Sequence, residues 1–293
     1  MNHGSSLPRR QLARFGSILV TGAAAREYLQ GQLSFDMSRL TPQRVELASC
    51  NSSQGRVQAV LWMVERSDAF VLILPAAMIE RTLARLRKYV LRSKVKVESG
   101  SERFAAYDAT SLSLAGVSMP ESTGVHVEHD ALSLIRWPGT NRILMLAPAD
   151  ASAEPDPAVE HAWRLEDIRA GLPQVYPESH ELFVAQMLNI DLLGGISFEK
   201  GCYTGQEIIA RAHFRGTVKR RMFRFRASCP APSPGTRVVV DGAHAGDVVD
   251  AVATPDGCEL LAVISLAQLN SPLALADVPS SSLTRLELPY AVG

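Results

Sequence analysis

Apolar and polar positions in the first third of the chain follow two periods, which predicts strands mixed with helices. Residues 76–91 repeat aliphatic side chains at steps of three and four, with arginines expected to face solvent, as in an amphipathic helix. A shorter helix is predicted at residues 23–33. The order strand, strand, helix, strand predicts a ferredoxin-like α+β domain. The predicted strands cover residues 15–20, 45–50, 57–65, 70–74, 95–98 and 103–108.

The pattern changes in the second half of the chain. Residues 147–157, APADASAEPDP, are small, polar and rich in proline, which predicts a linker. A helix is predicted at residues 158–170, and the Gly-Leu-Pro sequence after it would end that helix. From residue 219 onward, short apolar segments alternate with turns containing Pro or Gly, which predicts a small C-terminal β-barrel. Its strands are expected at residues 221–226, 236–240, 247–253 and 259–264.

Composition narrows the function. The 30 basic and 30 acidic residues cancel, which argues against a protein held on nucleic acid mainly by phosphate neutralisation. The densest basic cluster, residues 219–221 with Arg224 and Arg226, is more simply the solvent face of a strand. No apolar run reaches the roughly 20 residues that span a bilayer, so no membrane partner is expected. The four cysteines form no C-x-x-C motif, which favours a cytoplasmic protein with reduced thiols and no bound metal.

Residues 194–214 carry the most specific local signals. Two glycines at 194 and 195 predict a turn, followed by a short strand at residues 196–198. Thr204 and Glu207 have the spacing of a capping box, and a helical run over residues 208–214 follows them. The segment therefore predicts a strand, a loop and a helix N-terminus in succession.

Cys202 lies just ahead of this helix N-terminus. The helix dipole and unpaired backbone N–H groups favour negative charge there, and Lys200 would add a positive neighbour. Both would lower the pKa of the thiol and populate the reactive thiolate. Gly201 and Gly205 would let the backbone approach a ligand closely. From these residues alone, a buried structural cysteine is an equally weighted alternative; we interpret the other cysteines as structural, namely Cys50, Cys229 and Cys258.

The loop also resembles a known signature. The run Lys200, Gly201, Cys202, Tyr203, Thr204, Gly205, Gln206, Glu207 is similar to that of the YgfZ family, relatives of the glycine-cleavage T-protein. Further segments of the chain resemble the same family, namely YLQGQL at 28–33, QGRV at 54–57, IRAGLP at 168–173, QMLN at 186–189 and GGISF at 194–198.

This resemblance implies a fold and a function. It implies a T-protein-like arrangement of three domains around a central cavity that binds tetrahydrofolate or a derivative. It also implies a role in assembling or repairing iron–sulfur clusters, with effects on tRNA modification. The expected partners are folate and iron–sulfur client or assembly proteins, and direct tRNA contact is less favoured. The expected division is a disordered lead-in (1–10), a folate-binding domain (11–50 with 155–218), a ferredoxin-like domain (51–147) and a β-barrel (219–293).

Two departures from the T-protein bear on catalysis. The T-protein hairpin carries an acidic residue that assists the chemistry at folate, whereas residues 55–60 here read GRVQAV. The T-protein also has a glutamate where this chain has Arg169. Gln58 can accept a hydrogen bond from a pterin but cannot take a proton, and Arg169 can do neither. We therefore expect no aminomethyltransferase activity, with a tetrahydrofolate-dependent one-carbon transferase as the alternative.

The remaining candidate residues follow from the resemblance. Arg211, on the helix after the signature, could meet the glutamate tail of a folate, although a solvated helix face is the favoured interpretation. The resemblance implies folate contacts from Arg56, Gln58, Arg169, Gln186, Asn189 and Arg211.

Overall fold

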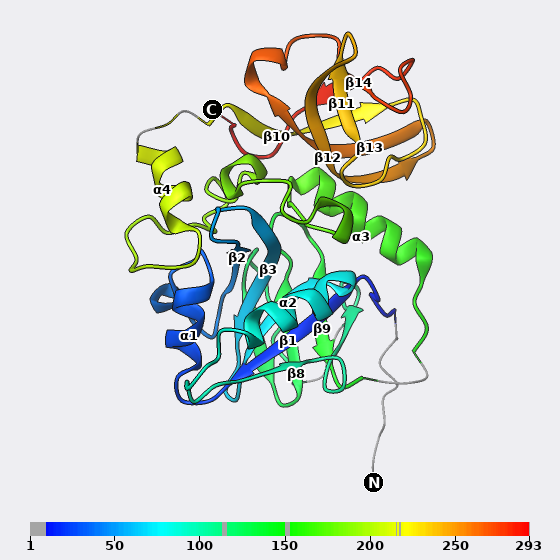
Figure 1. The fold of residues 1–293 in the computed structure, drawn as a ribbon. Coiled ribbons are helices and arrows are strands. Elements are labelled where there is room, and N and C mark those ends of the chain that lie inside the picture. Colours follow the sequence, from blue (N-terminus) through cyan, green and yellow to red (C-terminus); the bar gives the residue numbers. More distant parts are fainter. Residues whose placement is uncertain (1–9, 113–115, 150–152, 215, 217, 293) are drawn as a thin grey trace.

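The computed structural model describes residues 10–112, 116–149, 153–214, 216 and 218–292. Nearly all of the predicted lead-in, residues 1–9, lies outside the described residues. Two antiparallel sheets fill the lower part of Figure 1, and a third sheet stands above them, beyond helix α3 (Pro157–Ala170). Among the described residues, no helix combines the length and the apolarity needed to cross a membrane.

The first sheet is built from the N-terminal third of the chain. Its order is β2-β3-β4-β1-β5, and every neighbouring pair is antiparallel. The helix expected over residues 76–91 is shorter in the structure: a 3-10 turn at its start leads into helix α2 (Ile79–Arg87). Helix α1 covers Ala25–Gln32. The strands are β1 (Phe15–Thr21), β2 (Val45–Asn51), β3 (Val57–Glu65), β4 (Phe70–Pro75) and β5 (Lys96–Ser99).

Strands β2 and β3 form a hairpin. The domain boundary expected between residues 50 and 51 falls inside it, where backbone hydrogen bonds join the two strands into one sheet. The stretch 51–147 also contributes to a second sheet of order β6-β9-β8-β7. The strands of this sheet are β6 (Ala105–Asp108), β7 (His126–His129), β8 (Leu132–Arg136) and β9 (Ile143–Ala147).

Helix α3 (Pro157–Ala170) joins the lower sheets to the C-terminal sheet. The Asp156 side chain caps its first turn, proline occupies its first position, and Gly171 ends it in the left-handed conformation at φ 67°. Helix α4 (Gln206–Phe214) follows. Short 3-10 turns cover Met37–Arg39, Ala76–Met78, Pro177–Ser179, Ala185–Leu188 and Leu266–Gln268.

The C-terminal sheet has the order β14-β11-β12-β13-β10-β15 and curls into a half-barrel, as Figure 1 shows. One core cluster runs from the first sheet through Trp62, Trp137 and Trp163 into the C-terminal sheet. A second cluster is formed by residues of the C-terminal sheet and of the segments that connect its strands. The strands are β10 (Arg220–Ala227), β11 (Arg237–Val240), β12 (Ala243–Thr254), β13 (Gly257–Ser265), β14 (Ala274–Leu275) and β15 (Thr284–Leu286).

Candidate functional site

The candidate site is the loop that leads into α4. The strand predicted at residues 196–198 is wrong, because this segment runs without regular structure. Gly194 turns the chain at φ 77°, and the Ser197 N–H donates to the Ser34 carbonyl at 2.9 Å without a ladder forming around that bond. The chain therefore reaches the signature as an irregular loop tied to the end of α1.

Lys200 anchors this loop from inside. Its side chain is buried, and Nζ donates to the carbonyl oxygens of Gln30 at 2.5 Å, Leu33 at 2.9 Å and Phe35 at 2.8 Å. Burial lowers the pKa of Lys200 to about 8, while the carboxylate of Asp36 opposes the shift, so the side chain stays protonated at neutral pH. The ammonium expected beside the Cys202 thiol is turned instead toward three backbone carbonyls that follow or end α1.

The rest of the loop is fixed by its own short contacts. The Gln206 side chain accepts a hydrogen bond from the Tyr203 N–H at 3.3 Å and donates to the Lys200 carbonyl at 3.3 Å. These two bonds of Gln206 lie at the start of α4, where a capping box between Thr204 and Glu207 was expected. The Thr204 N–H donates to the Gly31 carbonyl at 3.2 Å, and the Tyr203 ring lies 5.0 Å from the Lys200 ammonium. The backbone on both sides of Cys202 is therefore held in place.

Cys202 is exposed on this anchored loop. The other three cysteines are buried, as expected for structural residues, and all four are free thiols. The alternative of a buried cysteine at position 202 is therefore excluded. An exposed sulfur on a fixed backbone can reach a partner molecule without the loop opening.

The loop packs against the turn of the β2–β3 hairpin. Gly205 has φ 84°, and a Cβ there would lie 2.5 Å from the Ser52 carbonyl oxygen. On the hairpin side, Gly55 has φ 71°, and its Cβ would meet Ile208 of α4 at 2.8 Å. Glycine is thus required at the contact itself. Gly201 has open space around it, so only one of the two glycines beside Cys202 serves a close approach.

Gly205→Ala should lower the free energy of unfolding by about 2–4 kcal/mol, because the left-handed conformation and the clash with a backbone oxygen both oppose a Cβ. Gly201→Ala is the matched control four residues earlier and should change stability by about 0.5 kcal/mol or less. Urea unfolding of both variants measures the difference. Equal stabilities of the two would contradict the packing of the loop on the hairpin.

Sequence reasoning missed Arg85. The arginines of α2 were expected to face solvent, but Arg85 donates to Gln58 at 3.0 Å, to Gln32 at 2.6 Å and to the Asn51 carbonyl at 3.2 Å. Gln58 in turn donates to Glu181 at 2.7 Å. A cavity of about 180 Å³ opens beside this network. It is lined by Cys50, Gln58, Ala59, Arg81, Thr82, Arg85 and His180.

The other residues implied for folate do not gather around this cavity. Arg56 is exposed and donates to the Leu182 carbonyl at 3.0 Å, and Arg169 pairs with Glu259 at 2.7 Å under the C-terminal sheet. Arg211 lies on the exposed face of α4, beside a hollow of about 370 Å³.

Gln186 and Asn189 are buried and connect neighbouring elements. Gln186 donates to the Ile209 carbonyl of α4 at 2.6 Å, and Asn189 donates to the Met222 carbonyl of β10 at 2.8 Å. The amide nitrogens of both residues donate to backbone carbonyls, which connects their segment to α4 and to the C-terminal sheet.

The basic cluster at the start of β10 differs from expectation. Arg221 is buried and forms two hydrogen bonds with Asp191, at 2.6 and 2.9 Å, instead of facing solvent. Arg224 pairs with Glu259 at 2.6 Å. The description of this cluster as the solvent face of a strand is wrong for these two residues, because acidic side chains from neighbouring segments reach them.

Comparison with known proteins agrees with this architecture. No family model matches the chain. The glycine cleavage system aminomethyltransferase T of Bartonella henselae has a similar structure, with a TM-score of 0.73 and 13% identity over 96% of this chain and 85% of that one. Two proteins named tRNA-modifying protein YgfZ are similar in sequence. That of Colwellia psychrerythraea is 28% identical over 96% of this chain and 93% of its own length, and that of Edwardsiella ictaluri is 29% identical over 94% and 89%.

The chain thus has the fold of the glycine-cleavage T-protein, with the α+β organisation that the sequence predicted. Within that class, its sequence is similar to both YgfZ proteins over nearly the whole chain, which supports the resemblance to the YgfZ family.

Proposed function

We propose that this protein is a folate-binding accessory factor for iron–sulfur proteins, acting in assembly or repair of their clusters, with Cys202 as its working thiol. The names of the two sequence relatives support an effect on tRNA modification. The T-protein fold supports a folate-related role. Four free cysteines are in line with a reducing compartment such as the cytoplasm. Its partners would be iron–sulfur client or assembly proteins rather than tRNA itself.

The observation that carries this proposal is the state of Cys202. It is exposed, while the loop around it is fixed by Lys200, Gln206 and the hairpin contact at Gly205. A thiol that serves only packing would be buried, as Cys50, Cys229 and Cys258 are. An accessible thiol on a rigid loop suits transfer or exchange with a docked partner.

The cavity beside Gln58 is the candidate folate contact. Its volume of about 180 Å³ is below the roughly 300–1,000 Å³ typical of drug-sized ligands, so it would admit a ring-sized part of the molecule. Arg81 and Arg85 would suit acidic or carbonyl groups, and Gln58 offers an amide. The residues that line this cavity therefore fit part of a folate. They would hold it through arginine and amide groups, where the T-protein uses carboxylates.

Cys202→Ser tests the role of the thiol. In a strain lacking its own YgfZ protein, the variant should leave cluster-enzyme activity at least about tenfold below that restored by the wild type, with an unchanged unfolding midpoint. A thiol reagent should modify one cysteine in the native wild type and none in the variant, because the other three are buried. Cys229→Ser is the control and should restore activity. Full restoration by Cys202→Ser would refute the proposal.

A one-carbon transferase acting at tetrahydrofolate is the second candidate, favoured by the aminomethyltransferase fold. Neither Gln58 nor Arg169 has a carboxylate, and the carboxylates beside them are engaged, Glu181 with Gln58 and Glu259 with Arg169. Folate-dependent product formation by the purified protein would favour this alternative.

A further inference from the structure

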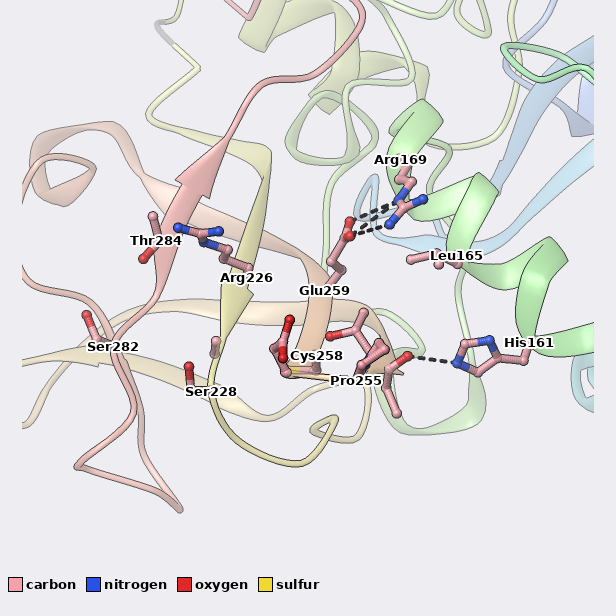
Figure 2. Close-up of a pocket in the computed structure, with 14 residues that line it drawn as sticks. His161, Leu165, Arg169, Arg226, Ser228, Pro255, Cys258, Glu259, Ser282 and Thr284 are labelled. Atoms are coloured by element: carbon pink, nitrogen blue, oxygen red, sulfur yellow. Dashed lines mark hydrogen bonds and ion pairs between the residues drawn. The ribbon is translucent and has the colours of Figure 1, made fainter. Parts of the chain in front are cut away.

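A second cavity lies between α3 and the C-terminal sheet. Its volume is about 570 Å³, within the usual range for a small-molecule site. Figure 2 shows α3 on one side and the strands of the half-barrel on the other. None of its lining residues belongs to the signature loop, the hairpin turn or the cavity beside Gln58. The polar lining residues that bear on a ligand are Arg169, Arg226, Ser228, Glu259, Ser282 and Thr284.

Three polar side chains cross the floor of this cavity in one row. Arg226 of β10 stands directly opposite Glu259 of β13 on one side and Thr284 of β15 on the other. Side chains that face each other across antiparallel strands lie on the same face of the sheet, about 4.5–5.5 Å apart at Cβ. An arginine opposite a glutamate would ordinarily pair with it.

Glu259 pairs elsewhere. One of its carboxylate oxygens accepts from Arg169 of α3 at 2.7 Å, and the other accepts from Arg224 at 2.6 Å. Both arginines hold the pKa of Glu259 below its usual value, although burial opposes them. The glutamate is therefore an acceptor that two cations already occupy.

Arg226 therefore lacks the carboxylate partner that its position opposite Glu259 would ordinarily give it. Within the part of the chain that the structure describes, no hydrogen bond or ion pair engages its guanidinium, and the residue is exposed to the cavity. Figure 2 shows this guanidinium beside Thr284, turned away from the Glu259 carboxylate. The cavity is lined by two arginines, Arg169 and Arg226, and by two carboxylates, Asp256 and Glu259. Arg169 and Arg224, which is not part of the lining, both pair with Glu259, so the negative charge of Glu259 does not offset the positive charge of Arg226.

The hydroxyl groups decide which anion suits the site. Ser228 lines the cavity just after β10, the strand that carries Arg226, and Ser282 and Thr284 line it from just before and at the start of the neighbouring strand β15. A planar carboxylate is satisfied by one arginine fork, whereas a phosphate has oxygens in several directions and takes donors from all of them.

We propose that this cavity binds the phosphate group of a ligand, with Arg226 as its principal cation and the hydroxyls of Ser228, Ser282 and Thr284 as further donors. The remaining volume leaves room for the body of a phosphorylated small molecule or for a segment of nucleic acid. This site goes beyond the proposed function, because it involves neither Cys202 nor the cavity beside Gln58.

Calorimetric titration of the whole chain with inorganic pyrophosphate tests the site by measuring the dissociation constant. Arg226→Gln should raise the dissociation constant about 10- to 100-fold, the value of one charge-assisted hydrogen-bonding group. Arg226→Lys should lose less, because the charge remains without the fork. The matched control is Arg285→Gln on β15, whose guanidinium lies over the Phe223 ring at 5.8 Å on the other face of the sheet. It should bind pyrophosphate as the wild type does.

The unfolding midpoint of Arg226→Gln should match that of the wild type, because no protein group loses a partner. Adenosine monophosphate and an oligoribonucleotide without terminal phosphates distinguish the two sources of phosphate. Arg226-dependent binding of adenosine monophosphate supports a phosphorylated small molecule as the ligand. Arg226-dependent binding of the oligoribonucleotide supports a nucleic-acid backbone. Absence of pyrophosphate binding, equal losses in the Arg226 and Arg285 variants, or equally tight binding of succinate would each overturn the proposal.

Discussion

Lys200→Met should lower the free energy of unfolding by about 3–5 kcal/mol and loosen the loop that carries Cys202. Methionine keeps the length of the side chain but donates nothing, so three carbonyl oxygens, two of them in fully buried contacts, lose their partner. A buried acceptor left unsatisfied costs about 1–3 kcal/mol. Denaturant unfolding measures the loss, and hydrogen exchange at the Thr204 amide should quicken, because that amide is bonded to the Gly31 carbonyl beside the anchor.

Lys96→Met is the matched control for this prediction. Lys96 lies on β5 with 70% of its side chain exposed and pairs with Glu98 of the same strand. Its replacement should change the free energy of unfolding by less than about 1 kcal/mol. If Lys200→Met lost no more than this control, the three carbonyl contacts would not hold the loop.

Elements with a local signal were predicted well from the sequence. Strands β1, β2, β3 and β4 were predicted within a residue or so of their ends, because each apolar run is bounded by turn residues. Helix α3 was predicted to within one residue, since the Gly-Leu-Pro sequence that begins at Gly171 marks its end. The segment 196–198 was wrongly predicted as a strand, because a short apolar run does not indicate whether another strand lies beside it to pair with.

The side-chain contacts of the candidate site could not be predicted, because they join residues that are far apart in the sequence. Lys200 is separated from its carbonyl partners by 165 to 170 residues, and no local pattern encodes that encounter. Arg85 was assigned to the solvent face of α2 because arginine usually lies there, yet Gln58 and Gln32 turn it toward the sheet. The acidic partners of Arg169 and Arg221 likewise come from elsewhere in the chain, so a resemblance between motifs could not place these side chains.

Asp167→Ala should also lower the free energy of unfolding by about 3–5 kcal/mol, through a different contact. The Asp167 carboxylate is only 1% exposed and accepts from Arg14 at 2.8 Å and from the Trp137 indole at 2.9 Å. Alanine would leave a buried guanidinium without its counter-charge and a buried N–H without an acceptor. Because these contacts tie α3 to the N-terminal segment and to the loop after β8, the loss should appear in global unfolding.

Asp156→Ala separates this effect from a general weakening of α3. Asp156 caps the same helix at its N-terminus, accepting from the Ala158 N–H at 2.9 Å, and its loss should cost about 1 kcal/mol. Urea unfolding of both variants, monitored by tryptophan fluorescence, compares them directly, since Trp137 and Trp163 lie beside Asp167 and within α3. Equal losses would mean that α3 is held by its own helical stability, whereas the larger loss at Asp167 locates the attachment of α3 in this buried ion pair.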